Sequence, residues 1–453
     1  MQSSSTPETR LSDELADLSP ARLSAARAGV LVLLATALFL AYLTRHSLAV
    51  VNTSMQQELG INNEQFGWII SAFSTGYLLC QIPGGWLGQR FGTRWMLAAF
   101  AAAWSVMTSL FTLAGSIWSL VTIRLLFGMA QAGLVPNQAQ VIKDWFPEQR
   151  RATTSSLLMA AMQVGSVASL ALTGWVSQSW GWRTIFHVYG ALGIAWAVVF
   201  AWWFRTYPQE MAWLTGGEAP LVQMDRSETR ASSAKIPWEP IFRSRSFWGL
   251  AGQAFFKAAG YNFAVTFFPA MLEFAYAVPK EQTGNLAAIS MVGLVAGSLI
   301  GGWTIDGVQR RTENKRVSRC LVAGISLVLT ASVMSAAPLM KTGMGLSLLM
   351  GVAALVSGFA QSPPWAAIID IGGKQTAVVM GFMNCASSLP GIIISPLTGR
   401  LMDQIQKTNG DWNIPILLHA LFYLLAALCW LAVDPNRTIE SVSSDREEPP
   451  HAV

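Results

Sequence analysis

Apolar residues form long runs along this chain, separated by short polar segments, from near residue 28 to near residue 434. A helix needs about 20 apolar residues to cross the hydrocarbon of a bilayer. Runs of that length predict twelve membrane-spanning helices, at 28–51, 66–88, 95–114, 118–142, 152–176, 184–205, 247–273, 283–305, 317–340, 344–369, 376–400 and 413–433. The predicted fold is therefore an all-α membrane protein.

The longest internal polar segment divides these spans into two sets of six. It covers 206–246, is rich in Glu, Arg, Ser and Pro, and predicts a cytoplasmic central loop. The six-helix bundles on either side are 28–205 and 247–434. The Ser-, Pro- and acid-containing segment 1–27 predicts a disordered cytoplasmic tail, and 435–453 predicts a second cytoplasmic tail.

The distribution of basic residues predicts the orientation. Lys and Arg concentrate on the cytoplasmic side of membrane proteins. With the N-terminus inside, only five of the 30 Lys and Arg fall in the outer segments, namely Arg183, Lys280, Lys341, Arg400 and Lys407. Both termini are therefore predicted to be cytoplasmic, which requires an even number of spans.

Composition narrows the class of protein. Hydrophobic residues make up 52% of the chain and charged residues 12%, about half the charged share of a globular protein. This argues against a soluble enzyme. The net charge of +5 follows from the predicted orientation and does not indicate nucleic acid. No CxxC, metal-ligand spacing, P-loop or nucleophile elbow occurs, so neither a metal nor a cofactor is predicted.

A glycine- and arginine-rich segment after the second span is repeated after the eighth. The residues that define it are Gly85, Gln89, Arg90, Gly92 and Arg94 in the first copy, and Gly302 and Asp306 in the second. Two matched halves of six spans are the plan of a rocker-switch carrier, whose binding site lies at the midplane between the halves. Such a carrier works as a single chain, and its repeated loops take part in the conformational change.

The doubled loop resembles the signature loop of the major facilitator superfamily, over about residues 28–434. Shorter motifs at 42–48, 81–85, 124–136 and 145–152 resemble the anion:cation symporter family. That family includes bacterial hexuronate, galactonate and phthalate permeases and the vesicular glutamate carriers. The resemblance implies a multi-pass protein of the bacterial inner membrane whose partners are the lipid bilayer and a small organic anion.

Three positions depart from the family, and each loses a carboxylate. Proton-coupled members carry Asp before the first-helix arginine and Glu seven residues after the fourth-helix arginine, where this chain has Thr44 and Gln131. The first loop has Gln89 where Asp is usual, whereas the second keeps Asp306. We therefore predict transport that is facilitated, exchanging, or coupled to something other than the usual proton pair. His46 is the titratable group nearest these positions, and a structural role is favoured for it.

Three basic residues lie inside predicted spans, where charge is costly and points to function. Arg45 and Arg124 carry planar donor forks that match a carboxylate bidentately. Lys257 has no obvious acidic partner in a neighbouring span. We expect Arg45 and Arg124 to bind the anionic group of the substrate, and Lys257 to act in substrate binding or in coupling. The alternative for the arginines is a snorkelling position near the interface, and for Lys257 a position facing headgroups or a water pocket.

Polar and aromatic residues of the spans complete the predicted site. By resemblance to the sugar-acid members they are Tyr77, Gln163, Trp365 and Asn384. Tyr42 and Gln131, which share helix faces with Arg45 and Arg124, and Gln361, which precedes Trp365, complete the predicted set. Amides and hydroxyls suit a polyhydroxylated ligand, because an amide offers both donors and acceptors and a hydroxyl serves as either. The alternative reading is hydrogen bonding between helices, which is common in membrane bundles.

Together these observations predict a carrier of an organic anion, with a sugar acid favoured and an aromatic or dicarboxylic acid as the alternative. A membrane-embedded enzyme would need carboxylate, His or Cys groups that converge, and the spans contain almost none. A transporter-like sensor would need a signalling domain, and the central loop contains no recognisable one. The coupling ion and the direction of transport stay open.

Overall fold

The computed structural model describes residues 20–51, 55, 58–61, 63–211 and 238–439. Helices dominate this part of the chain, and no strand occurs within it. The all-α prediction is confirmed. Most of the predicted tails and of the predicted central loop falls outside the described residues, at 1–19, 212–237 and 440–453.

The N-terminal half contains α2 (Pro20–Val50), α4 (Asn63–Phe91), α5 (Thr93–Leu110), α6 (Ile117–Ala132), α7 (Leu134–Trp145) and α8 (Arg151–Trp203). Residues 20–27, predicted as part of a disordered tail, instead extend α2. Proline fits the first turn of a helix, and Arg27 Nε anchors the extension by donating to the carbonyl oxygen of Trp145 at 2.7 Å.

The C-terminal half contains α10 (Trp238–Arg243), α11 (Arg245–Asn262), α12 (Phe268–Tyr276), α13 (Lys280–Thr312), α14 (Val322–Ser335), α15 (Gly343–Gly358), α16 (Pro363–Gly372), α17 (Thr376–Thr408) and α18 (Asn413–Cys429). Two π-helical segments belong to the same half, Phe263–Phe267 between α11 and α12 and Arg316–Leu321 before α14. α10 lies within the stretch predicted as the central loop.

Several predicted spans correspond to bent or interrupted helices. α8 bends at Gly181, whose φ of 75° favours glycine, and the bend separates predicted spans 5 and 6. Span 4 is divided at Gly133 into α6 and α7, and span 10 is divided at 359–362 into α15 and α16. Pro363 begins α16, where its missing N–H costs nothing. Breaks within a bilayer are tolerated where protein or a substrate path surrounds them.

Eight helical stretches of the described residues are long and apolar enough to cross a membrane. They cover predicted spans 1, 3, 4, 6, 8, 9 and 12, and one stretch, Gly343–Thr408, covers spans 10 and 11 together. Spans 2, 5 and 7 are helical in α4, α8 and α11–α12 but fall outside these eight. The twelve-span topology therefore stays a prediction.

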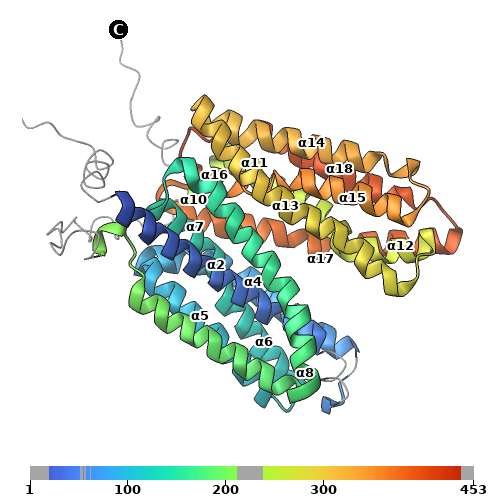
Figure 1. Ribbon diagram of the computed structural model, residues 1–453, viewed down its shortest axis with the longest axis horizontal. Coiled ribbons are helices and arrows are strands. Elements are labelled where there is room, and N and C mark those ends of the chain that lie inside the picture. The colour runs from blue at the N-terminus through green and yellow to red at the C-terminus, as the bar shows by residue number, and fades with distance from the viewer. Residues whose placement is uncertain (1–19, 52–54, 56–57, 62, 212–237, 440–453) are drawn as a thin grey trace, which may run out of the picture.

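The two halves lie beside each other and diverge toward one end of the molecule. In Figure 1 the blue-to-green half and the yellow-to-red half meet near α7, α10 and α16, and they separate toward α12 and the lower end of α8. Contacts between the halves run from α4 to α17 and from α8 to α13. We call the end near α7, α10 and α16 the closed end; it is the cytoplasmic end in the predicted topology.

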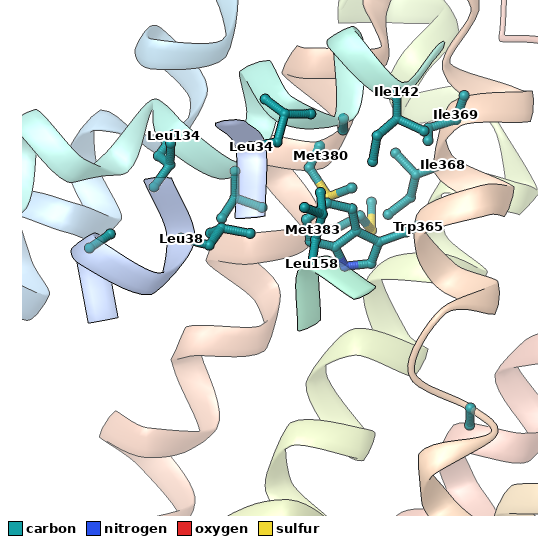
Figure 2. Packing of buried hydrophobic residues seen from close by; sticks show 14 of the residues in the cluster. Leu34, Leu38, Leu134, Ile142, Leu158, Trp365, Ile368, Ile369, Met380 and Met383 are labelled. Atoms are coloured by element: carbon teal, nitrogen blue, oxygen red, sulfur yellow. The ribbon is translucent and has the colours of Figure 1, made fainter. Parts of the chain in front are cut away.

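Apolar side chains from both halves fill the closed end. Figure 2 shows them in one cluster, with Leu34, Leu38, Leu134, Ile142 and Leu158 from the N-terminal half and Trp365, Ile368, Ile369, Met380 and Met383 from the C-terminal half. Each of these side chains is at most 7% exposed. The cluster therefore joins the halves and excludes water between them at this end.

Candidate functional site

Close packing of α4 on α6 forms one wall of the candidate site. A Cβ on Gly76 would come within 2.2 Å of the carbonyl oxygen of Leu125, and one on Gly128 within 2.2 Å of that of Phe73. Only glycine permits this approach, which is typical of small residues at helix interfaces in membranes. It brings Phe73 and neighbouring rings of α4 against the basic residues of α2 and α6.

Arg45 of α2 lies among three aromatic rings. Its guanidinium carbon is 4.5 Å from the ring centroid of Tyr42, 4.8 Å from that of Phe73 and 4.6 Å from that of Tyr77. Cation–π contacts of this kind hold a guanidinium without neutralising it. The side chains of Arg45, Tyr42 and Tyr77 are partly exposed, so the charge remains accessible to a ligand.

Gln131 of α6 provides the neutral partner of Arg45. Its Oε1 accepts hydrogen bonds from Arg45 Nε at 3.2 Å and from Nη2 at 3.1 Å. Its Nε2 donates to the carbonyl oxygen of Ala41 at 3.1 Å and to Thr44 Oγ1 at 3.2 Å. Thr44 is 1% exposed and its hydroxyl donates back to Leu40 in its own helix. The two predicted coupling positions are thus adjacent, and neither side chain ionises.

Arg124 is placed differently from Arg45. It is 4% exposed, and its Nη2 donates to the backbone carbonyl of Arg45 at 2.8 Å. Its guanidinium carbon lies 5.2 Å from the ring centroid of Phe73 and 4.7 Å from that of Phe127. Its Nε is buried and has no hydrogen-bond partner. In this conformation Arg124 orients the turn that carries Arg45, and its direct contact with substrate stays a prediction.

Lys257 of α11 faces the interruption between α15 and α16. Its Nζ donates to the carbonyl oxygen of Ala360 at 2.8 Å and to Gln361 Oε1 at 2.7 Å. The helix break frees the Ala360 carbonyl, as in the discontinuous helices of carriers. Lys257 and Gln361 are partly exposed. The second cation, like Arg45, therefore has neutral oxygen partners.

Side chains from the two halves converge between these cations. The Tyr261 side chain, one turn beyond Lys257 on α11, interacts with the Gln163 side chain of α8 in the N-terminal half. A second contact between the halves joins α17 to α4, where Asn384 Nδ2 donates to Gln81 Oε1 at 3.1 Å. We call the side chains around Arg45, Tyr261 and Lys257 the central site.

The remaining predicted residues lie at the margins of the central site. Trp365 is 7% exposed and belongs to the apolar cluster of the closed end (Figure 2), where it packs near Leu158 and Met383. A direct contact of Trp365 with substrate stays a prediction. The His46 ring packs on that of Tyr42 with 5.8 Å between centroids.

The repeated loops hold the halves together at the closed end. A Cβ on Gly85 would meet the Ala377 carbonyl oxygen at 2.5 Å, and one on Gly302 would meet Ser156 Oγ at 2.2 Å. Each glycine thus lets its helix, α4 or α13, approach the opposite half. Within the N-terminal half, Gly92 turns the chain with φ 89°. Two further residues of the first loop contact their own half, with Arg90 over Trp86 and Arg94 donating to the Ala201 carbonyl.

The residue four positions after Gly85 in the first loop differs from the residue four positions after Gly302 in the second. Asp306 accepts hydrogen bonds from the backbone N–H groups of Ala152 at 3.2 Å and Thr153 at 2.7 Å, at the start of α8. A carboxylate is favourable there because a helix N-terminus carries partial positive charge. In the first loop, Gln89 Nε2 donates to the Lys374 carbonyl at 2.8 Å instead.

Ion pairs surround Asp306 and cross between the halves. Asp370 of α16 pairs with Arg151 of α8 at 2.7 Å and with Arg319 at 3.4 Å, and Arg319 lies 3.9 Å from Asp306. Lys315 pairs with Glu148 at 2.9 Å. Arg319 is fully buried, so this network depends on its carboxylates.

Sequence reasoning did not single out several of these residues. Tyr261 and Gln81 could have been found as polar residues inside spans, and Arg319 and Asp370 as charges at span ends. The Ala360 carbonyl had only the Pro363–Pro364 pair as a signal. Phe73 had none, because an aromatic residue in a span is unremarkable by itself.

The fold and site define a multi-pass integral membrane protein with two matched halves and a polar region between them. A model of the Major Facilitator Superfamily matches residues 34–396 and 253–452. The chain belongs to this superfamily of transporters and is not an enzyme. Its structure resembles that of the proton:xylose symporter XylE bound to a halogenated sugar, with a TM-score of 0.68, 13% identity and coverage of 93% of this chain and 99% of that one.

Curated relatives are transporters. The chain is 25% identical to the probable sulfoacetate transporter SauU of Cupriavidus necator, over 92% of this chain and 95% of the relative. It is 27% identical to a D-galactonate transporter of Escherichia coli, over 82% and 88%. It is 26% identical to the probable galactarate/D-glucarate transporter GudP of Escherichia coli, over 90% and 93%.

Proposed function

We propose that this protein carries a small organic anion across the membrane by alternating access, with a sugar acid as its substrate class. The observation that carries the proposal is the state of Arg45. Three rings enclose its guanidinium, and its polar partner is the neutral amide oxygen of Gln131. A partly exposed cation that lacks a carboxylate partner offers its charge to an anion.

The roles of the surrounding residues follow from this placement. Arg45 binds the carboxylate, and Lys257 attracts the ligand from the opposite half. Tyr42, Tyr77, Gln163, Gln361 and Asn384 provide hydroxyl and amide groups for the hydroxyls of a sugar acid. The names of the relatives, which refer to galactonate, glucarate and sulfoacetate, support an anionic substrate.

The setting of the carrier is part of the proposal. The excess of Lys and Arg in the predicted cytoplasmic segments supports twelve spans with both termini inside. The bacterial origin of the relatives named above supports the bacterial inner membrane. Residues of a single chain form the central site, which supports a monomer as the functional unit.

A ligand panel tests the substrate class. The purified protein is heated with D-galactonate, D-glucarate, sulfoacetate, an aromatic acid, a dicarboxylic acid and the neutral galactitol. We expect sugar acids to raise the melting temperature and galactitol, which has hydroxyls but no charge, to leave it unchanged. Uptake of the best labelled acid into proteoliposomes then distinguishes a carrier from a sensor or an enzyme. Equal stabilisation by galactitol would contradict the proposal.

A further inference from the structure

The three cations of the central region all have neutral partners. Arg45 contacts the Gln131 amide, Arg124 contacts a backbone carbonyl, and Lys257 contacts the Ala360 carbonyl and Gln361. Within the described part of the chain, no carboxylate lies within ion-pair distance of any of the three. The region therefore carries positive charge without an internal counter-ion.

Among the described residues that surround Arg45, no side chain supplies the missing negative charge. Thr44 and Gln131, which contact each other beside Arg45, do not ionise. Tyrosine hydroxyls such as that of Tyr42 are neutral at pH 7. His46 packs on Tyr42, and a proton taken up there would add positive charge. Proton binding therefore cannot neutralise this site.

In the present conformation two of the three cations, Arg45 and Lys257, are partly exposed, whereas Arg124 is buried. The closed end is sealed by the apolar cluster (Figure 2), whereas Arg45 and Lys257 are partly exposed. Alternating access requires the halves to rock about the site, so that each end closes in turn. In the occluded state between these two conformations the site is closed on both sides, and the cations lose hydration. A desolvated cation without a counter-ion is strongly unfavourable, and a bound anion removes that penalty.

We propose that this carrier is an anion exchanger. Its halves rock between the two conformations readily when an anion is bound, and only rarely when the site is empty. This inference rests on the proposed function, since it assigns the mode of transport to the same central site. Its consequence is that one anion leaves only as another enters. The counter-ion that makes the crossing favourable is the substrate itself.

Efflux from proteoliposomes tests the inference. Vesicles are loaded in parallel with labelled D-galactonate, D-glucarate or sulfoacetate, in HEPES buffer with equal K⁺ and valinomycin to hold the membrane potential at zero. They are diluted into buffer with or without the same unlabelled acid. We expect release to be at least about 30-fold faster with acid outside, a ratio that corresponds to about 2 kcal/mol in the barrier.

The wild-type ratio already separates the outcomes. A ratio near one, with rapid release in both buffers, overturns the exchange mode while the proposed function stands. Absence of release of all three acids in both buffers, from protein that remains folded, overturns the proposed function and the exchange inference with it.

A carboxylate introduced beside Arg45 tests the physical cause. Gln131→Glu replaces an oxygen that lies 3.1 and 3.2 Å from the guanidinium nitrogens by a charged one. We expect the empty carrier to change conformation faster, so that the ratio of release with acid outside to release without it falls to within about threefold of one. The matched control, Gln404→Glu, adds the same charge at an exposed position near the outer end of α17 and should leave the ratio unchanged.

A second variant keeps the test independent of the folding of the first. Gln361→Glu places a carboxylate at the amide oxygen that lies 2.7 Å from Lys257 Nζ. It should lower the ratio in the same direction. Two folded variants that both keep the wild-type ratio would show that site charge does not set the mode of transport, and would overturn the inference.

Discussion

The N-terminal and C-terminal halves each contain one copy of the repeated loop but differ in where charge is paired. In the N-terminal half, Arg45 contacts aromatic rings and an amide, and the first loop has the uncharged Gln89 four residues after Gly85. In the C-terminal half, the second loop ends in Asp306, which faces the start of α8, and Arg319 and Asp370 form buried ion pairs. At the closed end, basic and acidic side chains form ion pairs. At the central site, the cations have no acidic partner among the described residues.

This difference separates two tasks. Paired charges that cross between the halves stabilise one conformation, because opening that end would break them and expose them to water. Unpaired cations at the central site gain a partner when an anion binds. We therefore expect changes at the closed end to shift the conformational equilibrium, and changes at the central site to alter affinity.

The largest effect is expected from Arg45→Lys. Lysine keeps the charge but cannot reproduce the bidentate fork or the stacking among three rings. Loss of one charge-assisted hydrogen bond costs about 1.5–3 kcal/mol, so affinity for the acid should fall roughly 10- to 100-fold. Calorimetry or concentration-dependent thermal shifts measure it. Arg400→Lys, at an exposed position on α17, is the control. Affinity within twofold of wild type would rule out Arg45 as the anchor.

The next effect concerns Lys257 and the number of charges on the ligand. Lys257→Gln removes one positive charge from the C-terminal side of the central site. At an effective dielectric constant near 20, one additional charge about 10 Å away contributes about 1.7 kcal/mol. The dianion glucarate should therefore lose roughly tenfold more affinity than the monoanion galactonate. Lys407→Gln, in an exposed position, is the control. Equal losses for both acids would assign Lys257 a structural role.

The all-α membrane fold could be predicted from the sequence because long apolar runs depend on the bilayer more than on packing. The orientation that the Lys/Arg bias indicates stays a prediction. The breaks were less predictable. Gly133 divides span 4 and residues 359–362 divide span 10, and both depend on contacts with the opposite half or a neighbouring helix. The early start of α2 at Pro20 depends on the contact of Arg27 with Trp145, which lies far away in sequence.

The central site was predicted in part. Charge inside a span identified Arg45 and Lys257, because such charge is rarely retained without a use. The sequence did not indicate that Arg124 would bind the backbone of Arg45 or that Trp365 would join the apolar cluster. Side-chain direction depends on how helices rotate against each other, and glycine contacts such as Gly128 against Phe73 set that rotation.

A smaller effect is expected at the second loop. Asp306→Asn keeps the shape of the side chain but removes the charge that faces the start of α8, which contributes about 1 kcal/mol at a helix N-terminus. The closed end should open roughly fivefold more often. Hydrogen–deuterium exchange of a peptide that contains Ala152 and Thr153 measures this directly, because both amides donate to Asp306. Asp306→Glu, which keeps the charge, is the control. Unchanged exchange in the Asn variant would show that the ion pairs alone hold the end.

The smallest effect is expected when the first loop is given the acid that the second loop has. Gln89→Asp places a carboxylate before the start of α17, where helix charge favours it by a few tenths to about 1 kcal/mol. The same change removes the hydrogen bond from Gln89 Nε2 to the Lys374 carbonyl, which offsets part of the gain. Exchange of a peptide covering 374–380 should therefore slow by no more than about threefold, and substrate affinity should not change. Gln89→Asn, which shortens the side chain without adding charge, isolates the electrostatic part. Faster exchange in the Asp variant than in the Asn variant would show that the two loops are not equivalent in geometry. The stabilising effect of the Asp306 carboxylate would then depend on Arg319 and not on the helix that it faces.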